Sequence, residues 1–265
     1  MTLRGHLKRL RYGLTFGAGS KFPYFGTTVY FPKNSMIFQL ACDQGIYEAA
    51  LTRLVSKTIR AGTIYMDVGA NIGLLSVPAL ATRPDCRVVS IEASPTTLQY
   101  LRRTHATSEY KRRWTIVEEG VADICGEATF YQSIPERGAM DGFRDTGRSG
   151  ETRPVSVSVT TIDTIWRKLG YPETSVIKLD IEGGEMAALK GAEECLRANR
   201  PLVFLEWNGE NLNAYGIDHS EILQFARTNN FRLVTLPHFV EILHGIDLKL
   251  HMDETGTFAL IPVTL

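Results

Sequence analysis

Residues 65–76 read YMDVGANIGLLS, the most informative stretch of the chain for its fold. An apolar run ends in Asp67 and Val68, glycines stand at positions 69 and 73, and apolar residues at helical spacing follow. Glycine permits backbone torsions and a close ligand approach that a Cβ atom would block, and the start of a helix offers free N–H groups. The stretch therefore predicts a buried strand over 63–70, a ligand-binding turn, and a helix over 71–82 with a kink or early stop at Pro78.

The rest of the chain continues this alternation. The pattern predicts further strands at 86–93, 112–123, 127–133, 175–180, 201–208, 231–236 and 256–264, and helices at 94–106, 160–170, 184–199 and 219–230. Strands separated by helix-length segments indicate an α/β fold with a mostly parallel, doubly wound sheet. In such sheets the ligands bind at the carboxyl ends of the strands.

Two regions depart from this rhythm. Residues 1–60 end in an amphipathic segment and are predicted to form an N-terminal cap, which leaves residues 61–265 as the main domain. Residues 134–154 are rich in Gly, Arg and Asp and show no periodicity. Long loops in compact domains are usually either functional or disordered, so this segment is either a lid over an acceptor site or a disordered surface loop.

Composition excludes several classes of protein. Lys plus Arg equals Asp plus Glu at 29 each, so no global charge favours nucleic acid. No apolar run reaches the roughly 18–20 residues of a membrane helix, and the basic first residues lack the apolar core of a signal peptide. The four cysteines are scattered without a CxxC pair, which favours free thiols in a reducing compartment. We expect a soluble, cytoplasmic protein with a small-molecule partner.

The glycine turn differs from the dinucleotide fingerprint, because position 71 is Asn where that pattern requires a second Gly. Asp67 would repel a pyrophosphate but would favour a cation or an amino group. S-adenosylmethionine, with a nucleoside, an ammonium and a sulfonium, fits this electrostatic character. Glu92 ends the next strand, 19 positions after Gly73, where an acid can accept both ribose hydroxyls. The alternatives are that Asp67 caps the turn and that Glu92 is a solvated strand end.

The third strand supplies the adenine contacts in this interpretation. Val121 is predicted to pack on the ring, and Asp123 to accept a hydrogen bond from its amino group. The alternative is that residues 118–120 form a plain turn.

Five motifs then point to one family. DVGANIG (67–73), IEASP (91–95), TTIDTIW (160–166), IKLDIEGGEMAALKGA (177–192) and FLEWN (204–208) resemble the FkbM-type methyltransferases in order and spacing, from about residue 47 to residue 208. The resemblance implies a class I methyltransferase (Rossmann-like) fold, with a seven-stranded sheet whose last strand is antiparallel. It also implies S-adenosylmethionine as the donor, and O-methylation of a hydroxyl on a sugar or natural product, free or in a glycoconjugate.

These inferences assign a site. Asp180, Glu182 and Glu206 are the predicted catalytic acids, with Asp180 orienting or deprotonating the acceptor hydroxyl. Glu185 either caps the helix that follows or contacts substrate. The predicted cofactor-binding residues are Asp67, Gly69, Ala70, Asn71, Gly73, Glu92, Ala93, Val121 and Asp123.

Several alternatives stay open at this stage. Asp180, Glu206 and Asn208 would line neighbouring strand ends, where all-oxygen ligands suit Mg²⁺; we favour hydrogen bonds to loops or substrate there, with no metal. Tyr47 and Trp207 either stack on a sugar ring or pack in the core, and Lys178 either pairs with a carboxylate or is structural. The rival functions are N-methylation of an amine acceptor and a catalytically silent nucleoside-binding module. The sequence does not identify the acceptor.

Overall fold

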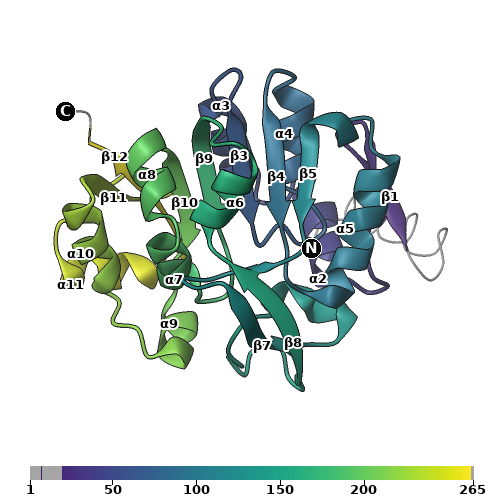
Figure 1. Cartoon of the computed structure of the whole chain (residues 1–265). Helices are drawn as coiled ribbons and strands as arrows, with labels where there is room; N and C mark the ends of the chain where they lie inside the picture. The colour runs from purple at the N-terminus through teal and green to yellow at the C-terminus, as the bar shows by residue number, and fades with distance from the viewer. Residues whose placement is uncertain (1–6, 8–19, 264–265) are drawn as a thin grey trace.

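A seven-stranded sheet forms the centre of the molecule (Figure 1). The computed structural model describes residue 7 and residues 20–263. The strands follow the order β11-β12-β10-β9-β3-β4-β5, and β12 is antiparallel to both of its neighbours. Their bounds are β3 (Ile64–Val68), β4 (Arg87–Ile91), β5 (Trp114–Val117), β9 (Thr174–Leu179), β10 (Leu202–Glu206), β11 (Phe231–Thr235) and β12 (Thr257–Pro262). The predicted sheet, with its last strand antiparallel, is confirmed.

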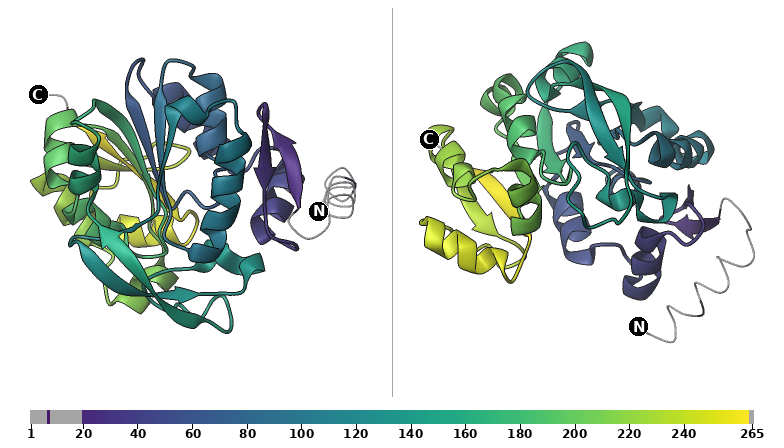
Figure 2. Two further views of the ribbon diagram at one scale, coloured as in Figure 1. Left: turned by 45° about the vertical axis from the view of Figure 1, so that its right-hand side comes forward. Right: turned by 90° about the horizontal axis from the view of Figure 1, so that it is seen from below.

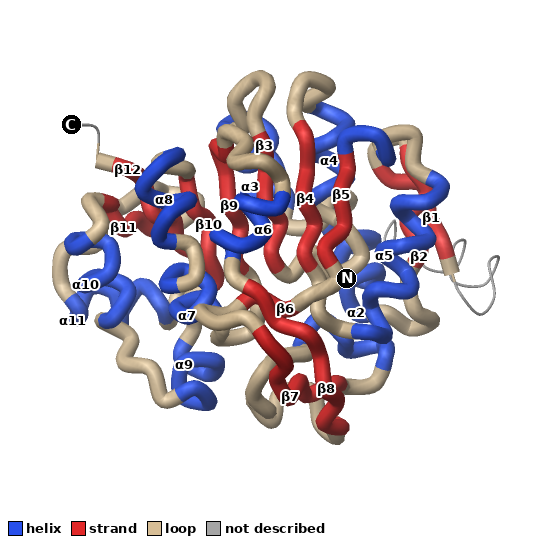
Figure 3. The backbone as a smooth tube through the Cα atoms, in the orientation of Figure 1, coloured by secondary structure: helices blue, strands red, loops and turns tan. Residues whose placement is uncertain are grey.

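Helices cover both faces of this sheet because its strands bury side chains in both directions. Met66 and Val68 face a core shared with α6 (Ile162–Lys168), α7 (Glu185–Lys190), α8 (Glu193–Asn199), α10 (Glu221–Thr228) and α11 (Gly245–Met252). Tyr65, between them, faces a second core shared with α3 (Ala49–Thr58), α4 (Ser76–Thr82) and α5 (Pro95–Thr107). Figure 3 shows the resulting three layers, in which the strands lie between the helices.

Part of the predicted secondary structure was wrong in its bounds. The strand expected at 112–123 is two strands in different sheets, because β5 ends at Val117 and β6 (Gly120–Val121) pairs instead with β8 (Arg153–Thr160). The strand expected at 127–133 is β7 (Gly126–Gln132), which pairs with β8 to complete a small three-stranded sheet. Sequence reasoning missed β8 although its residues, RPVSVSVT, alternate in the way a half-buried strand does.

Two helices are also shorter than expected. The helix expected at 71–82 begins only at Ser76, so Pro78 lies in its first turn, where a missing N–H costs no hydrogen bond. The helix expected at 184–199 breaks into α7 and α8 near Gly191. A Cβ atom at Gly191 would lie 2.2 Å from the carbonyl oxygen of Ala122, which shows how closely this break packs against the end of β6.

The N-terminal segment packs against the main sheet's helices. A hairpin of β1 (Lys21–Tyr24) and β2 (Thr27–Tyr30) lies beside α5, at the end of the molecule away from β11 (Figure 2). The next helix, α2 (Met36–Gln44), places Phe38 in the same core as Val77 and Leu101. Residues 1–6 and 8–19 of the predicted cap lie outside the described residues. Residues 20–60 share a hydrophobic core with the rest of the chain.

Two of the remaining connections, η2 (Pro135–Met140) and α9 (Gly209–Tyr215), lie near the carboxyl ends of the strands, whereas η1 (Lys111–Arg113) directly precedes β5 at the opposite edge of the sheet. All four cysteines are free thiols, as predicted; Cys125 is exposed and the other three are buried. Across residue 7 and residues 20–263, we find no helix with the length and apolar character that crossing a membrane requires.

Candidate active site

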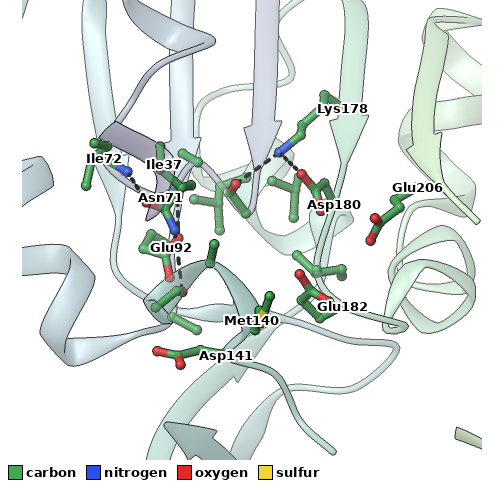
Figure 4. Close-up of a pocket in the computed structure, with 18 of the residues that line it drawn as sticks. Ile37, Asn71, Ile72, Glu92, Met140, Asp141, Lys178, Asp180, Glu182 and Glu206 are labelled. Atoms are coloured by element: carbon green, nitrogen blue, oxygen red, sulfur yellow. Dashed lines mark hydrogen bonds and ion pairs between the residues drawn. The ribbon is translucent and has the colours of Figure 1, made fainter. Parts of the chain in front are cut away.

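A cavity of about 210 Å³ opens at the carboxyl ends of β3, β4, β9 and β10. Figure 4 shows its two sides. Asn71 and Glu92 lie on one side, whereas Asp180, Glu182 and Glu206 lie on the other. The parallel strands bring these residues together from positions far apart in the chain, as expected at the carboxyl edge of a doubly wound sheet.

Glu92 and Asn71 are hydrogen-bonded to each other on the cofactor side of the cavity proposed from the sequence. The backbone nitrogen of Asn71 donates to Oε2 of Glu92 at 2.8 Å, and the backbone nitrogen of Ser94 donates to Oε1 at 2.8 Å. Asn71 adopts a left-handed conformation, with φ of +50°, which turns its N–H toward the acid. Burial raises the pKa of Glu92 to about 7 although both N–H donors oppose the shift. Each carboxylate oxygen keeps a lone pair for a ligand hydroxyl.

Glycine at position 69 lets the turn after β3 approach the end of β9 closely. Its φ is +74°, and a Cβ atom there would lie 1.9 Å from the carbonyl oxygen of Asp180. Ala70, Ala93 and Val121 also line the cavity with small or apolar surfaces. A small-residue cradle beside a buried acid fits the nucleoside and methionine parts of S-adenosylmethionine, the donor that the family resemblance implies.

Three of the predicted cofactor residues do not line the cavity. Asp67 is fully buried; it accepts a hydrogen bond from the hydroxyl of Ser76 at 2.5 Å and lies 3.7 Å from the ammonium of Lys178. Gly73, with φ of +91°, lies against Trp114 in the core. Asp123 follows β6 and lies outside the set of lining residues. Asp67 and Gly73 therefore support the glycine turn through contacts in the core and do not face the cavity.

The three predicted catalytic acids do come together. Asp180, Glu182 and Glu206 each present an oxygen within 4.8 Å of the others. The amide nitrogen of Asn211 donates to both Glu182 and Glu206 at 3.1 Å, and the guanidinium of Arg148 lies 3.1 Å from Glu182. On the far side, the ammonium of Lys178 lies 3.1 Å from Asp180.

This crowding changes the acid–base character of the cluster. Burial and the charge of Asp180 raise the pKa of Glu182 to about 7, while Arg148 opposes the shift. The pKa of Glu206 is raised well above its ordinary value by burial and by Asp180. A carboxyl with a pKa near 7 is well matched to remove a proton from a substrate at neutral pH.

A metal ion fits this cluster less well than a hydrogen-bonded substrate. The three carboxylates are close enough to share a cation, but the cations Lys178 and Arg148 already offset part of their charge, and one oxygen of each acid is already in contact with Lys178, Arg148 or Asn211. Asn208, the fourth oxygen ligand considered from the sequence, instead caps α9, where its side chain accepts from the backbone nitrogen of Asn211 at 2.9 Å.

Glu185 and Trp207, for which the sequence left a substrate contact open, have structural roles. Glu185 is buried and its Oε1 accepts from the backbone nitrogen of Ile181 at 2.9 Å, so it closes the loop after β9 and does not line the cavity. Trp207 is buried in the core and donates from its indole nitrogen to the carbonyl oxygen of His219. Tyr47 does line the cavity.

Sequence reasoning missed the residues that two irregular segments contribute. Glu48, just before α3, lines the cavity and has a left-handed backbone with φ of +43°. Its pKa is raised to about 7 by burial and by the charge of Asp180. From residues 134–154, Met140, Phe143 and Arg148 line the cavity. This segment therefore lines the cavity, although its lack of periodicity gave no residue-level signal. A lid over an acceptor site stays a prediction.

The central sheet and the cavity at its carboxyl edge define a class I methyltransferase fold. The model of the methyltransferase FkbM domain matches residues 67–233, which is most of the chain, and the chain belongs to this family.

Individual relatives are distant. The chain is 23% identical over 155 residues to the methyltransferase sdnD of Sordaria araneosa, covering 49% of this chain and 60% of that protein. The crystal structure of a methyltransferase FkbM from Methylobacillus flagellatus aligns with 16% identity and a TM-score of 0.47, covering 84% of this chain and 54% of the other. An O-methyltransferase from neocarzinostatin biosynthesis aligns with 10% identity and a TM-score of 0.44, covering 86% of this chain and 56% of the other. The chain therefore spans between half and two thirds of each of these proteins.

Proposed function

We propose that this S-adenosylmethionine-dependent methyltransferase methylates a hydroxyl group of a sugar or natural-product acceptor. The observation that carries the proposal is the cluster of Asp180, Glu182 and Glu206, whose oxygens lie within 4.8 Å of one another in the same cavity as Asn71 and Glu92. Carboxylates accept hydrogen bonds from hydroxyl groups, so the cluster can bind the acceptor's hydroxyl by a hydrogen bond and also accept its proton.

The cofactor and the acceptor then occupy opposite sides of one cavity. S-adenosylmethionine, when bound, supplies a methyl group carried on a positively charged sulfur. Glu92 holds ribose hydroxyls, and the turn at Gly69–Asn71 surrounds the methionine end. Asp180 orients the acceptor hydroxyl against the methyl group, and such orientation can lower the barrier by several kcal/mol, up to about 7–11 in ideal cases.

The acceptor hydroxyl must lose its proton as its oxygen bonds to the methyl carbon. Glu182 is placed to take that proton, since its pKa of about 7 leaves a large fraction in the basic form at neutral pH. The electron pair of the broken bond stays on the cofactor's sulfur, which becomes uncharged. The products are a methyl ether and S-adenosylhomocysteine, and the proton leaves from Glu182 to solvent.

Two measurements on the purified chain test this function. Calorimetry is expected to show binding of S-adenosylmethionine and S-adenosylhomocysteine, and the absence of both would contradict the donor assignment. Transfer of a radiolabelled methyl group to a panel of sugars, phenols and alcohols, with matched amines beside them, distinguishes the acceptors. Methylation of amines alone would establish the N-methyltransferase alternative, and binding without transfer to any member would favour the silent module. The cytoplasmic location stays a prediction.

A further inference from the structure

A second cavity, of about 310 Å³, lies beside the catalytic one. Leu51 and Leu54 of α3 form one of its walls, and Leu236 and Pro237, which follow β11, form another. We call this cavity the aliphatic groove. Among residue 7 and residues 20–263, no lysine, arginine or histidine lines it, so these residues offer an anionic ligand such as a phosphate no counter-charge there. Its size and apolar walls match those of ordinary small-molecule pockets, which add a few polar groups for orientation.

Glu48 connects the groove to the catalytic cavity. This residue lines both, and it also lines a third, small cavity of about 30 Å³ between them, together with Asp180 and Glu206. Leu51 and Thr257 line the small cavity and the groove in common. A ligand in the groove would therefore direct one end past Glu48 toward the acids that we assign to the acceptor hydroxyl.

The local backbone fixes Glu48 at this junction. Its nitrogen donates to Oε1 of Gln44 at 2.9 Å, and its carbonyl oxygen accepts from the nitrogen of Thr52 at 2.9 Å. The side chain makes no cap for α3. The carboxylate of Glu48 is thus held among the three cavities without being used to begin the helix.

The cofactor is not the occupant of the groove. The residues proposed to hold the cofactor, among them Asn71, Glu92 and Val121, line the catalytic cavity and do not line the groove. The groove shares Glu48 with the small cavity that Asp180 and Glu206 line, so an acceptor whose hydroxyl meets the acid cluster can extend past Glu48 into the groove.

We propose that the aliphatic groove binds an apolar portion of the acceptor, so that the substrate is an amphiphile whose hydroxyl lies near an alkyl chain or apolar ring. This inference depends on the proposed function, because it takes the acid cluster as the hydroxyl site. It narrows the acceptor class from any sugar or natural product to those that carry an aliphatic part within reach of the methylated oxygen.

Binding of 1-hexanol, 1-octanol and 1-decanol to the full chain, saturated with S-adenosylhomocysteine, tests the proposal. Each methylene that enters an apolar site contributes about 0.8 kcal/mol, or roughly fourfold in affinity. We expect affinity to rise by about that factor per methylene until the groove is filled. Octyl methyl ether should bind more weakly than 1-octanol, because it has no O–H to donate to the carboxylates. No dependence on chain length would overturn the proposal, and equal binding of the ether and the alcohol would make the groove an unrelated apolar site.

A matched pair of variants on α3 tests whether the dependence of affinity on chain length arises in the groove. Ala50 is exposed and lines the groove, so Ala50→Trp fills it, whereas Arg53 is exposed on the same helix and does not line it. We expect Ala50→Trp to remove the dependence on chain length and Arg53→Trp to retain it, with S-adenosylhomocysteine affinity unchanged in both. Retention of the dependence in Ala50→Trp would overturn the proposal. So would a dimer, detected by light scattering, that Ala50→Trp dissociates, since a second copy would then be the occupant. Failure of wild type to bind S-adenosylhomocysteine would instead contradict the proposed function.

Discussion

The Nζ atom of Lys178 lies 3.1 Å from Oδ2 of Asp180 and donates to the carbonyl oxygen of Gly69 at 3.0 Å. The same ammonium lies 3.7 Å from Asp67. Lys178 is only 3% exposed, and although burial opposes its charge, the pKa of its ammonium is raised by Asp180, Asp67 and Glu48. One buried cation therefore ties the glycine turn of the cofactor side to the acid of the acceptor side.

Lys178→Met should destabilise the protein strongly. Removing one partner of a buried ion pair leaves uncompensated charge and typically costs about 3–5 kcal/mol, and here two acids lose their cation. Urea unfolding of the variant measures this loss. Lys168→Met is the matched control, because Lys168 is 63% exposed and lies 3.7 Å from Glu119, an arrangement worth about 0–1 kcal/mol. Equal losses in the two variants would contradict a buried ion-pair role for Lys178.

Glu92→Gln and Asp180→Asn should separate binding from turnover. Glu92 is proposed to hold ribose hydroxyls, and hydrogen bonds to a charged group contribute about 1.5–3 kcal/mol. Glu92→Gln should therefore weaken S-adenosylhomocysteine binding roughly 10–100-fold by calorimetry. Asp180→Asn should leave that affinity nearly unchanged and lower methyl transfer roughly 10²-fold, because the acceptor hydroxyl loses the carboxylate that orients it. The reverse pattern would exchange the two assigned roles.

The pH dependence of methyl transfer should report Glu182. Because its pKa is raised to about 7 and the base must be deprotonated, kcat/KM should rise with pH through about 7 and then level off. Arg148 opposes this shift from 3.1 Å, so Arg148→Gln should move the midpoint to higher pH. A profile measured on an acceptor from the panel checks both expectations. An unchanged midpoint in Arg148→Gln would remove Glu182 from the role of base.

Glu185 should make the folded state less stable as pH rises. Burial raises its pKa to about 8 from an ordinary value near 4.5, so between these values the folded state holds a proton that the unfolded state has released. Stability then falls with increasing pH across that window, and the contribution from the Glu185 proton is fully lost above about pH 8. Each pKa unit corresponds to about 1.4 kcal/mol, so a loss of a few kcal/mol is expected.

Glu185→Gln tests this contribution. Its side-chain oxygen can still accept from the backbone nitrogen of Ile181, the bond that Glu185 makes at 2.9 Å, while the titrating group is gone. Urea unfolding at pH 5, 7 and 8.5 should show a flatter pH dependence in the variant than in wild type. The same slope in both proteins would mean that other buried acids account for the loss.

Much of the fold follows from local sequence because the doubly wound sheet repeats one simple pattern. Each strand that ends in an acid, such as β4 before Glu92 and β9 before Asp180, was predictable from an apolar run and the glycines or helix signals after it. The split between β5 and β6 was not, because both halves are apolar and only their pairing partners differ. Such a choice depends on tertiary contacts that no local window contains.

The site was also predictable only in part, for the residues that regular strands position. Glu182 and Glu206 were found because one comes shortly after the regular strand β9 and the other ends the regular strand β10. Glu48 and Arg148 come from segments without periodicity, and their place in the cavity depends on how those segments fold over the sheet. Asp67 shows the opposite error: the motif predicted a ligand contact, but the strand's alternation turns its side chain toward Ser76 and Lys178.

Gly69→Ala and Gly62→Ala should separate close packing from backbone torsion. Both glycines have positive φ, +74° and +76°, so each alanine pays a similar penalty of about 1–2 kcal/mol for a left-handed backbone. A Cβ atom at Gly62 meets nothing within 4 Å, whereas one at Gly69 would lie 1.9 Å from the carbonyl oxygen of Asp180. Backbone cannot yield as a flexible side chain does, so Gly69→Ala must displace either the turn or the strand end.

We therefore expect Gly69→Ala to lose about 1–3 kcal/mol more stability than Gly62→Ala in urea unfolding, the usual cost of overpacking. Because the displaced atoms belong to both sides of the cavity, Gly69→Ala should also weaken S-adenosylhomocysteine binding and slow methyl transfer together, while Gly62→Ala should change neither. Equal stabilities and intact binding in the two variants would show that the turn and the catalytic strand tolerate separation, and that their contact does not position the site.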